Sequence, residues 1–141
     1  GGKAGGILAE ILLLDQFSRN IFRGCAMAFD QDRQARKLCR QAMRKGQDML
    51  LPPVQRAFLY MPLQHSECKE DQDMSVECYE QLARSAEGLL ADFMGSFLQS
   101  ARDHRDITIR FGRFPHRNKA LGRASTAEEE VYLQSGRRFG Q

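Results

Sequence analysis

The residues best suited to chemistry are concentrated in one stretch, His104 to Arg123, with the sequence HRDITIRFGRFPHRNKALGR. It contains two of the three histidines of the chain, and its five arginines and one lysine outnumber its single aspartate. Arginine presents a planar fork that binds phosphate or carboxylate, and histidine exchanges protons near neutral pH. The stretch therefore predicts a site for an anionic ligand.

Candidate site residues fall into two groups. The predicted ligand-binding residues are Arg19, Arg105, Arg113, His116, Arg117 and Asn118. The candidate catalytic residues are His65, His104, Asp15 and Glu67, in which a carboxylate would orient a histidine that acts as general base. The sequence leaves open whether the chain is an enzyme.

The arginines of this stretch have two further interpretations. They could pair with Asp103, Asp106 and the acidic run 128–130, and so tie the last helix to the rest of the domain. Phe111 and Phe114 lie between the arginines, a pattern that would also suit base stacking in contact with RNA.

No metal or cofactor is predicted. His65, Glu67, His104 and His116 are able to bind zinc, but the intervals between them match no known ligand spacing. The four cysteines show no CxxC spacing, and Cys68 and Cys78 would lie about 15 Å apart along one helix, too far for a disulfide. Free thiols are typical of the cytoplasm, which is the expected location.

Length and composition predict one globular domain over residues 1–141. The chain is 42% hydrophobic and 28% charged, which supplies enough apolar side chains for a core. Because no run of about 18 apolar residues occurs, no membrane span is predicted. GGKAGG does not resemble a secretory signal and is interpreted as a flexible segment over residues 1–6. The Gly/Arg-rich residues 135–141 are expected to form a frayed tail.

Apolar residues recur at helical spacing in six segments, at about 7–19, 30–45, 53–65, 74–82, 90–111 and 127–133. Pro62 is expected to interrupt the third segment, and Gly112 to end the fifth. Ser125 and Glu128 are expected to form a capping box before the last helix. With no convincing strand pattern, the predicted fold is an all-α antiparallel array of helix hairpins.

The second predicted helix, at about 30–45, carries a basic face. This face comprises Arg33, Lys37, Arg40, Arg44 and Lys45. It is interpreted as a solvated surface rather than a nucleic-acid site.

His104 continues the apolar stripe of the long helix, so its ring is expected to face the packed side of the domain. A buried histidine needs a hydrogen-bond partner. Asp15 or Glu67, near His65, is the predicted partner, and a backbone carbonyl is the alternative. In the first case His104 would form the floor of a pocket with a rim of Arg105, His116 and Arg117.

Three blocks of the sequence resemble the bacterial family named domain of unknown function 924: ILLLDQFSRNIFRG (11–24), AFLYMPLQHSE (57–67) and HRDITIRFGRFPHRNKALGRASTAEE (104–129). The resemblance implies a tetratricopeptide-like helical fold and no established activity. Members usually carry a Trp-containing helical segment upstream of the first block, so that segment is expected to be missing here. Ser18 stands where the family commonly has proline, which should let the first helix continue.

Together these observations favour a helical domain whose His/Arg-rich pocket binds an anionic small molecule or peptide. The alternative is a protein–protein interaction scaffold without catalytic activity. Contact with RNA is the third hypothesis. The oligomeric state is left open.

Overall fold

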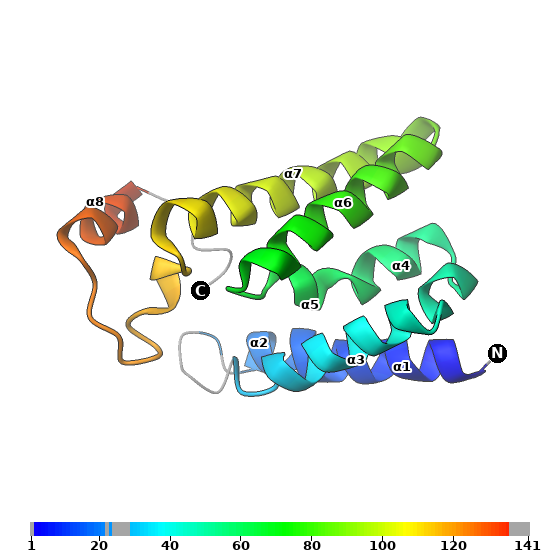
Figure 1. Ribbon diagram of the computed structural model, residues 1–141, viewed down its shortest axis with the longest axis horizontal. Coiled ribbons are helices and arrows are strands. Elements are labelled where there is room, and N and C mark those ends of the chain that lie inside the picture. Colours follow the sequence, from blue (N-terminus) through cyan, green and yellow to red (C-terminus); the bar gives the residue numbers. More distant parts are fainter. Residues whose placement is uncertain (1, 22, 24–28, 136–141) are drawn as a thin grey trace.

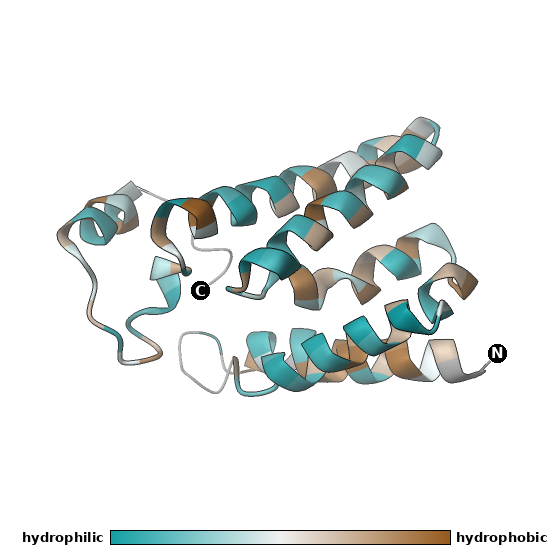
Figure 2. Cartoon of the chain, viewed as in Figure 1, coloured by the Kyte–Doolittle hydropathy of each residue, from teal (hydrophilic) through white to brown (hydrophobic). Residues whose placement is uncertain are grey.

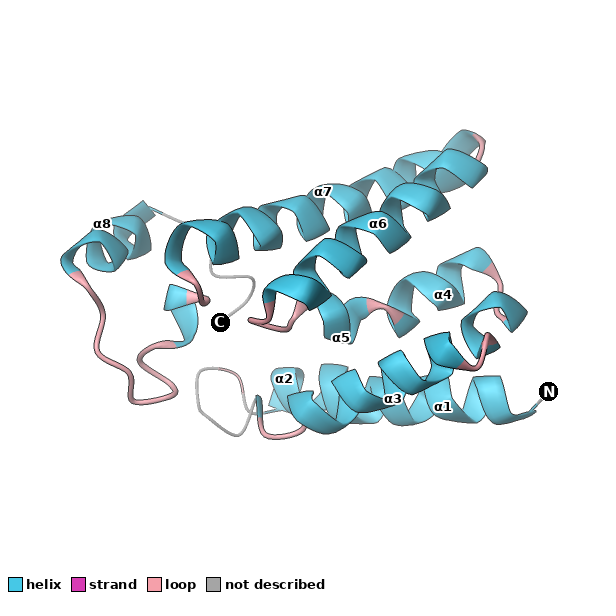
Figure 3. Ribbon diagram, in the orientation of Figure 1, coloured by secondary structure: helices cyan, strands magenta, loops and turns pink. Residues whose placement is uncertain are grey.

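A computed structural model describes residues 2–21, 23 and 29–135, and its regular structure is helical (Figures 1 and 3). Within these residues no β-strand occurs, so the predicted all-α fold is confirmed. None of the described helices is long and apolar enough to cross a membrane. The tail predicted for 135–141 lies outside the described residues except for Ser135, which ends the last helix.

The helices form three layers (Figure 1). Helix α1 (Gly2–Leu12) packs beside α3 (Asp32–Arg44), and α6 (Lys69–Ser85) runs antiparallel to the long α7 (Gly88–Phe111). Between these layers lie the short helices α4 (Pro53–Leu59) and α5 (Met61–Gln64), followed in the chain by α6. Helix α8 (Ala127–Ser135) is joined to α7 by an extended connection that includes the 3-10 turn η4 (Pro115–Arg117).

The first helical segment begins earlier than its sequence indicated. Residues 2–6, expected to be a flexible segment, form the start of α1 because Ala4 packs into the core with 5% of its surface exposed. After Leu12 the chain makes a π-helical turn, η1 (Leu13–Phe17), and continues as α2 (Ser18–Ile21). The helix passes through Ser18 without a break, as the absence of proline predicted.

The other boundaries follow local chemistry. The helix predicted from Pro53 divides into α4 and α5 before Pro62, which lacks the N–H group that would continue the helix. Helix α6 includes the acidic stretch from Lys69 and therefore begins before the predicted Met74. Gly112 ends α7 with a φ of 75°, a conformation that glycine adopts without steric cost.

Large side chains from all three layers meet in the core. The Tyr79 ring is completely buried, stacks on Phe97 at 5.5 Å between ring centres, and its hydroxyl donates to the carbonyl oxygen of Ala57 at 2.7 Å. Leu59 and Leu63 from the middle layer are almost fully buried in the same cluster. Apolar residues accordingly lie on the inward sides of the helices, with hydrophilic residues outside (Figure 2). This core packs α5 against α3 and α7, and α6 against α7, and so positions the turn between α5 and α6, where the candidate site lies.

Candidate functional site

The site is built around Asp15, which lies in the π-helical turn of the first helical segment. Its side chain is 1% exposed, and its Oδ1 accepts hydrogen bonds from Arg19 Nη1 and from His65 Nδ1, both at 2.8 Å. π-Helical turns displace a side chain from the regular helical register and are frequent at functional sites. His65 follows α5 directly, and its hydrogen bond with Asp15 places its ring against the first helical segment.

Asp15, Arg19 and His65, all candidate residues from the sequence, therefore lie together. Asp32, the first residue of α3, belongs to the same cluster. Its two oxygens accept hydrogen bonds from Arg19 at 2.6 and 2.8 Å, and Arg117 Nη1 lies 3.6 Å from its Oδ2. Asp32 thus joins Arg19 of the first helical segment to Arg117, which lies 98 positions later in the chain.

Arg117 is a buried arginine, with 6% of its surface exposed. Its Nη2 donates to the carbonyl oxygen of His65 at 2.7 Å, and its guanidinium lies 4.5 Å from the ring centre of Phe29 and 4.7 Å from that of Phe114. Aromatic faces attract guanidinium groups. Burial lowers the pKa of Arg117 to about 10, which still leaves the group charged at neutral pH.

The protonation states of the Asp15–His65 pair follow from burial and neighbouring charge. Burial and the positive charge of Arg19 lower the pKa of His65, so its ring is neutral at pH 7. Burial would raise the pKa of Asp15, but the hydrogen bond of His65 and the charge of Arg19 together lower it. An ionised Asp15 accepts the proton of Nδ1, so the basic lone pair of His65 is on Nε2.

His104 packs behind His65, with 6.2 Å between the ring centres, and is 4% exposed. The prediction that it faces the packed side is confirmed, but the predicted carboxylate partner is wrong. Its Nδ1 instead lies 2.7 Å from the carbonyl oxygen of Ser100, one turn earlier in α7, and 3.2 Å from Gln64 Nε2. Burial, together with the neighbouring histidine His65, lowers the pKa of His104 to about 2, so it is a neutral packing group at pH 7.

Glu67 forms the other carboxylate of the site. It accepts hydrogen bonds from both Nη atoms of Arg123, at 3.0 and 3.1 Å, and from the backbone N–H of Phe114 at 2.6 Å. Arg123 also donates to the carbonyl oxygen of Phe114 and to Asn118 Oδ1. Glu67 and Arg123 therefore fix the connection after α7, and the sequence interpretation did not single out Arg123.

A pocket of about 400 Å³ opens beside His65, between α3, the α5–α6 turn and the connection after α7. Its lining includes aromatic, aliphatic and charged side chains: Phe29, Asp32, Arg33, Arg36, Pro62, His65, Ser66, Glu67, Arg117 and Leu121. Of the predicted site residues, His65, Glu67 and Arg117 line this pocket directly. Asp15 and Arg19 support it from behind.

Four predicted site residues lie elsewhere. Arg105 is 4.0 Å from Asp73, while Arg113 forms two hydrogen bonds with Glu129 at 2.7 and 2.9 Å.

His116 is buried against Phe114, with 5.5 Å between ring centres, and Asn118 donates to Ser125 at 3.0 Å. The pocket rim predicted from Arg105 and His116 is therefore wrong, and only Arg117 of that rim lines the pocket. Arg113 confirms the alternative interpretation, in which arginines tie the last helix to the domain.

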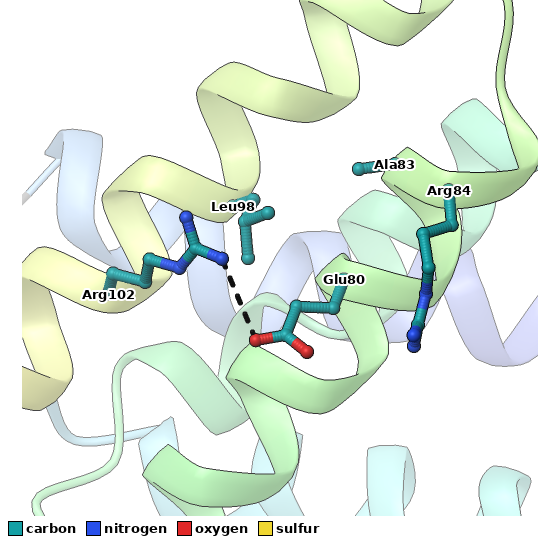
Figure 4. A pocket seen from close by; sticks show the side chains of 5 residues that line it. All are labelled: Glu80, Ala83, Arg84, Leu98 and Arg102. Atoms are coloured by element: carbon teal, nitrogen blue, oxygen red, sulfur yellow. Dashed lines mark ion pairs between the residues drawn. The ribbon is translucent and has the colours of Figure 1, made fainter.

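A second hollow, of about 360 Å³, lies between α6 and α7 (Figure 4). It is lined by Glu80, Ala83, Arg84, Leu98 and Arg102, and an ion pair of 3.7 Å joins Glu80 to Arg102. Its described lining contains no histidine and no buried charge, so these residues do not offer the acid–base chemistry of the first pocket.

Metal and thiol chemistry have little support in the described part of the chain. Among residues 2–21, 23 and 29–135, no three His, Cys, Asp or Glu side chains are placed to hold a metal ion together. Cys39, Cys68 and Cys78 are free thiols, and Cys25 lies outside the described residues. Burial raises the pKa of Cys78 to about 12 and that of Cys39 further, so both are protonated at neutral pH.

Comparison with known proteins gives a family but no activity. The family model described as a bacterial protein of unknown function, DUF924, matches residues 2–137. A solved structure of a protein of unknown function from Agrobacterium tumefaciens is 41% identical, with a TM-score of 0.81, over 94% of this chain and 69% of that chain. A search of curated proteins returned no match.

Proposed function

This chain belongs to the DUF924 family of bacterial proteins of unknown function, and we propose that it binds a small anionic molecule in the pocket beside His65. Arg33 carries the proposal: it lines the pocket, is exposed, and has no carboxylate partner among the described residues. The two carboxylates of the pocket, by contrast, are already paired with arginines. A ligand with a carboxylate or phosphate group would supply the missing negative charge.

The shape of the pocket supports a small ligand. Its volume of about 400 Å³ falls within the range of small-molecule sites, which are usually part apolar with a few polar anchors. Phe29, Pro62 and Leu121 supply apolar lining. The guanidinium of Arg117 is held in place by the carbonyl of His65, so its position is set before a ligand arrives.

Binding can be tested with pyrophosphate and citrate as probes, by calorimetry and by the shift in melting temperature. We expect both probes to bind the wild-type protein, and Arg33→Ala to weaken binding by about tenfold, the loss of one charge-assisted contact. Arg84→Ala removes an exposed arginine on α6 and should leave binding unchanged. The proposal would be contradicted if one of the probes did not bind the wild-type protein, or if Arg33→Ala and Arg84→Ala weakened binding equally.

The Asp15–His65 pair favours a second function, acid–base catalysis on the bound molecule. A carboxylate that holds Nδ1–H leaves Nε2 as the proton acceptor, the arrangement in which histidine acts as a general base. His65 lines the pocket, so it is one of the side chains that a bound molecule would contact. Any probe that binds should be incubated with the protein and followed by NMR. Conversion by the wild type that is lost in His65→Gln would support catalysis, and conversion retained in that variant would exclude His65 as the base.

A cytoplasmic location is part of the same proposal. It is supported by the free thiols of Cys39, Cys68 and Cys78, which are typical of a reducing compartment. Titration of the denatured, unreduced protein with a thiol reagent should count all four cysteines. A disulfide between any two would contradict this location.

A further inference from the structure

The outward face of α3 forms a basic groove that is separate from the chemistry around His65. Within the described part of the chain its lining consists of five cations: Arg33, Arg36, Lys37, Arg40 and Arg44. The groove has a volume of about 290 Å³ and follows one side of the helix, which is hydrophilic along its length in Figure 2. From its first to its last arginine it spans about 16 Å, at 1.5 Å per residue.

The charge of this basic groove is poorly compensated. Arg36 and Arg40 share one carboxylate, the buried Asp71, whose Oδ1 lies 3.1 Å from Arg40 Nη1. Arg33, Lys37 and Arg44 are exposed, and within the described part of the chain no carboxylate lies within ion-pair distance of them. Like charges on successive turns of one helix repel each other, so such a surface costs stability unless a partner neutralises it. A solvated face, the interpretation from sequence, does not require this concentration of arginine.

A neighbouring hollow indicates the kind of partner. Arg40 and Arg44 also border a recess of about 270 Å³ whose other lining residues are Met43 and Met74. Methionine is flexible and polarizable, and it is common on surfaces that accept apolar side chains of different shapes. Among the residues that the structure describes, no aromatic ring lines either the basic groove or this recess. Single-stranded nucleic acid binds through stacking on aromatic rings as well as through charge. The described lining supplies the charge but no ring on which a base could stack.

We propose that the basic groove of α3, together with the Met43–Met74 recess, binds an acidic peptide segment of a partner protein. Carboxylates along the segment would pair with the arginine forks, and an apolar side chain beside them would enter the recess. The proposal does not rest on the pocket function. Lys37 and Arg44 belong to the groove but not to the pocket, so the two surfaces can be tested separately.

The experiment uses a fluorescein-labelled glutamate-rich peptide with a central leucine, followed by fluorescence anisotropy. We expect binding that weakens as salt rises and is absent for the same peptide with glutamine in place of glutamate. The double variant Lys37→Glu, Arg44→Glu should weaken binding at least about tenfold. The control Arg84→Glu, Arg102→Glu reverses the same amount of charge on the α6–α7 side and should change the Kd less than about twofold. Neither Lys37 nor Arg44 has a partner in the described fold, so the melting temperature of the first double variant should not fall.

Two results would overturn this proposal. One is tighter binding of polyuridylate than of the acidic peptide, which would assign the groove to nucleic acid. The other is equal weakening by both double variants, which would reduce the effect to net charge. Pyrophosphate binding is also measured in the double variant Lys37→Glu, Arg44→Glu. If this variant loses the peptide but still binds pyrophosphate, the two ligands bind different surfaces, and the two proposals are tested separately.

Discussion

Asp15 and His65 are 50 positions apart in the chain, and a hydrogen bond of 2.8 Å joins Asp15 Oδ1 to His65 Nδ1. One residue lies in the π-helical turn of the first helical segment and the other in the turn between α5 and α6. Arg19 contacts the same carboxylate oxygen. The bond therefore joins two layers of the fold at the wall of the pocket, so any change to it should affect stability and ligand binding together.

Replacement of Asp15 tests how much this connection stabilises the fold. We expect Asp15→Ala to lower the free energy of unfolding by about 3 kcal/mol, because removal of one member of a buried charged network leaves the other members without their partner. Urea denaturation of both proteins measures the difference. Asp73→Ala is the matched control: Asp73 has 54% of its side chain exposed and lies 4.0 Å from Arg105, so its loss should cost less than about 0.5 kcal/mol. Equal costs at the two positions would show that the Asp15 network adds nothing to stability.

The lowered pKa of His104 should make the stability of the protein depend on pH. Its pKa is lowered from 6.5 to about 2 in the folded protein. Below pH ~6.5 the unfolded chain therefore binds a proton that the folded protein does not, and stability falls as pH falls, by about 1.4 kcal/mol per pH unit for each such histidine. His65, with its pKa also lowered, contributes in the same direction.

Urea denaturation between pH 7 and pH 5 checks this prediction. His104→Gln removes the titrating group and should reduce the loss of stability over that interval by about 2 kcal/mol. If the variant and the wild type had the same pH profile, the pKa of His104 would be the same in the folded and the unfolded protein, and the prediction would be wrong.

The sequence predicted the helices better than it predicted the contacts between them. Pro62 and Gly112 act locally, through a missing N–H group and a left-handed backbone, so the interruption and the helix end at these residues were predictable. The burial of His104 followed from its place on an apolar stripe. Its partner did not, because a histidine in a helix can reach the carbonyl one turn back as easily as a distant carboxylate.

The candidate site was predictable in composition but not in geometry. Asp15 and His65 were both candidates, yet no spacing rule relates residues so far apart, and only the fold shows that they meet. Asp32 was not among the candidates, because an aspartate at the start of an apolar periodic segment is typical of a helix cap. Its role between Arg19 and Arg117 depends on two tertiary contacts that leave no local pattern.

The capping box of α8 lies one residue later than its sequence indicated, and this gives a third prediction. Glu129, not Glu128, accepts the backbone N–H of Thr126 at 2.9 Å, while its own N–H donates to Thr126 Oγ1 at 3.1 Å. Glu129 also receives both hydrogen bonds of Arg113, which lower its pKa to about 2. We expect Glu129→Gln to speed amide hydrogen exchange throughout 127–135, since one side chain caps the helix and attaches it to the domain.

Glu128→Gln is the control for that experiment. Glu128 is 68% exposed and lies 3.6 Å from Arg110, so its replacement should leave exchange in α8 unchanged. Faster exchange in Glu128→Gln than in Glu129→Gln would restore the capping box that the sequence suggested and contradict the observed one.

Two glycines of α7 should respond to alanine in opposite directions. Gly112 has a φ of 75°, where a Cβ atom clashes with the following carbonyl, so Gly112→Ala should lower the free energy of unfolding by about 1 kcal/mol. Gly95 lies in the interior of the helix, and a Cβ atom built there meets nothing within 4 Å. Gly95→Ala should therefore raise the free energy of unfolding by up to about 1 kcal/mol, because alanine loses less backbone entropy in a helix. Urea denaturation of the two variants measures both signs, and destabilisation by Gly95→Ala would mean that α7 packs against a surface beyond the described residues, such as a partner.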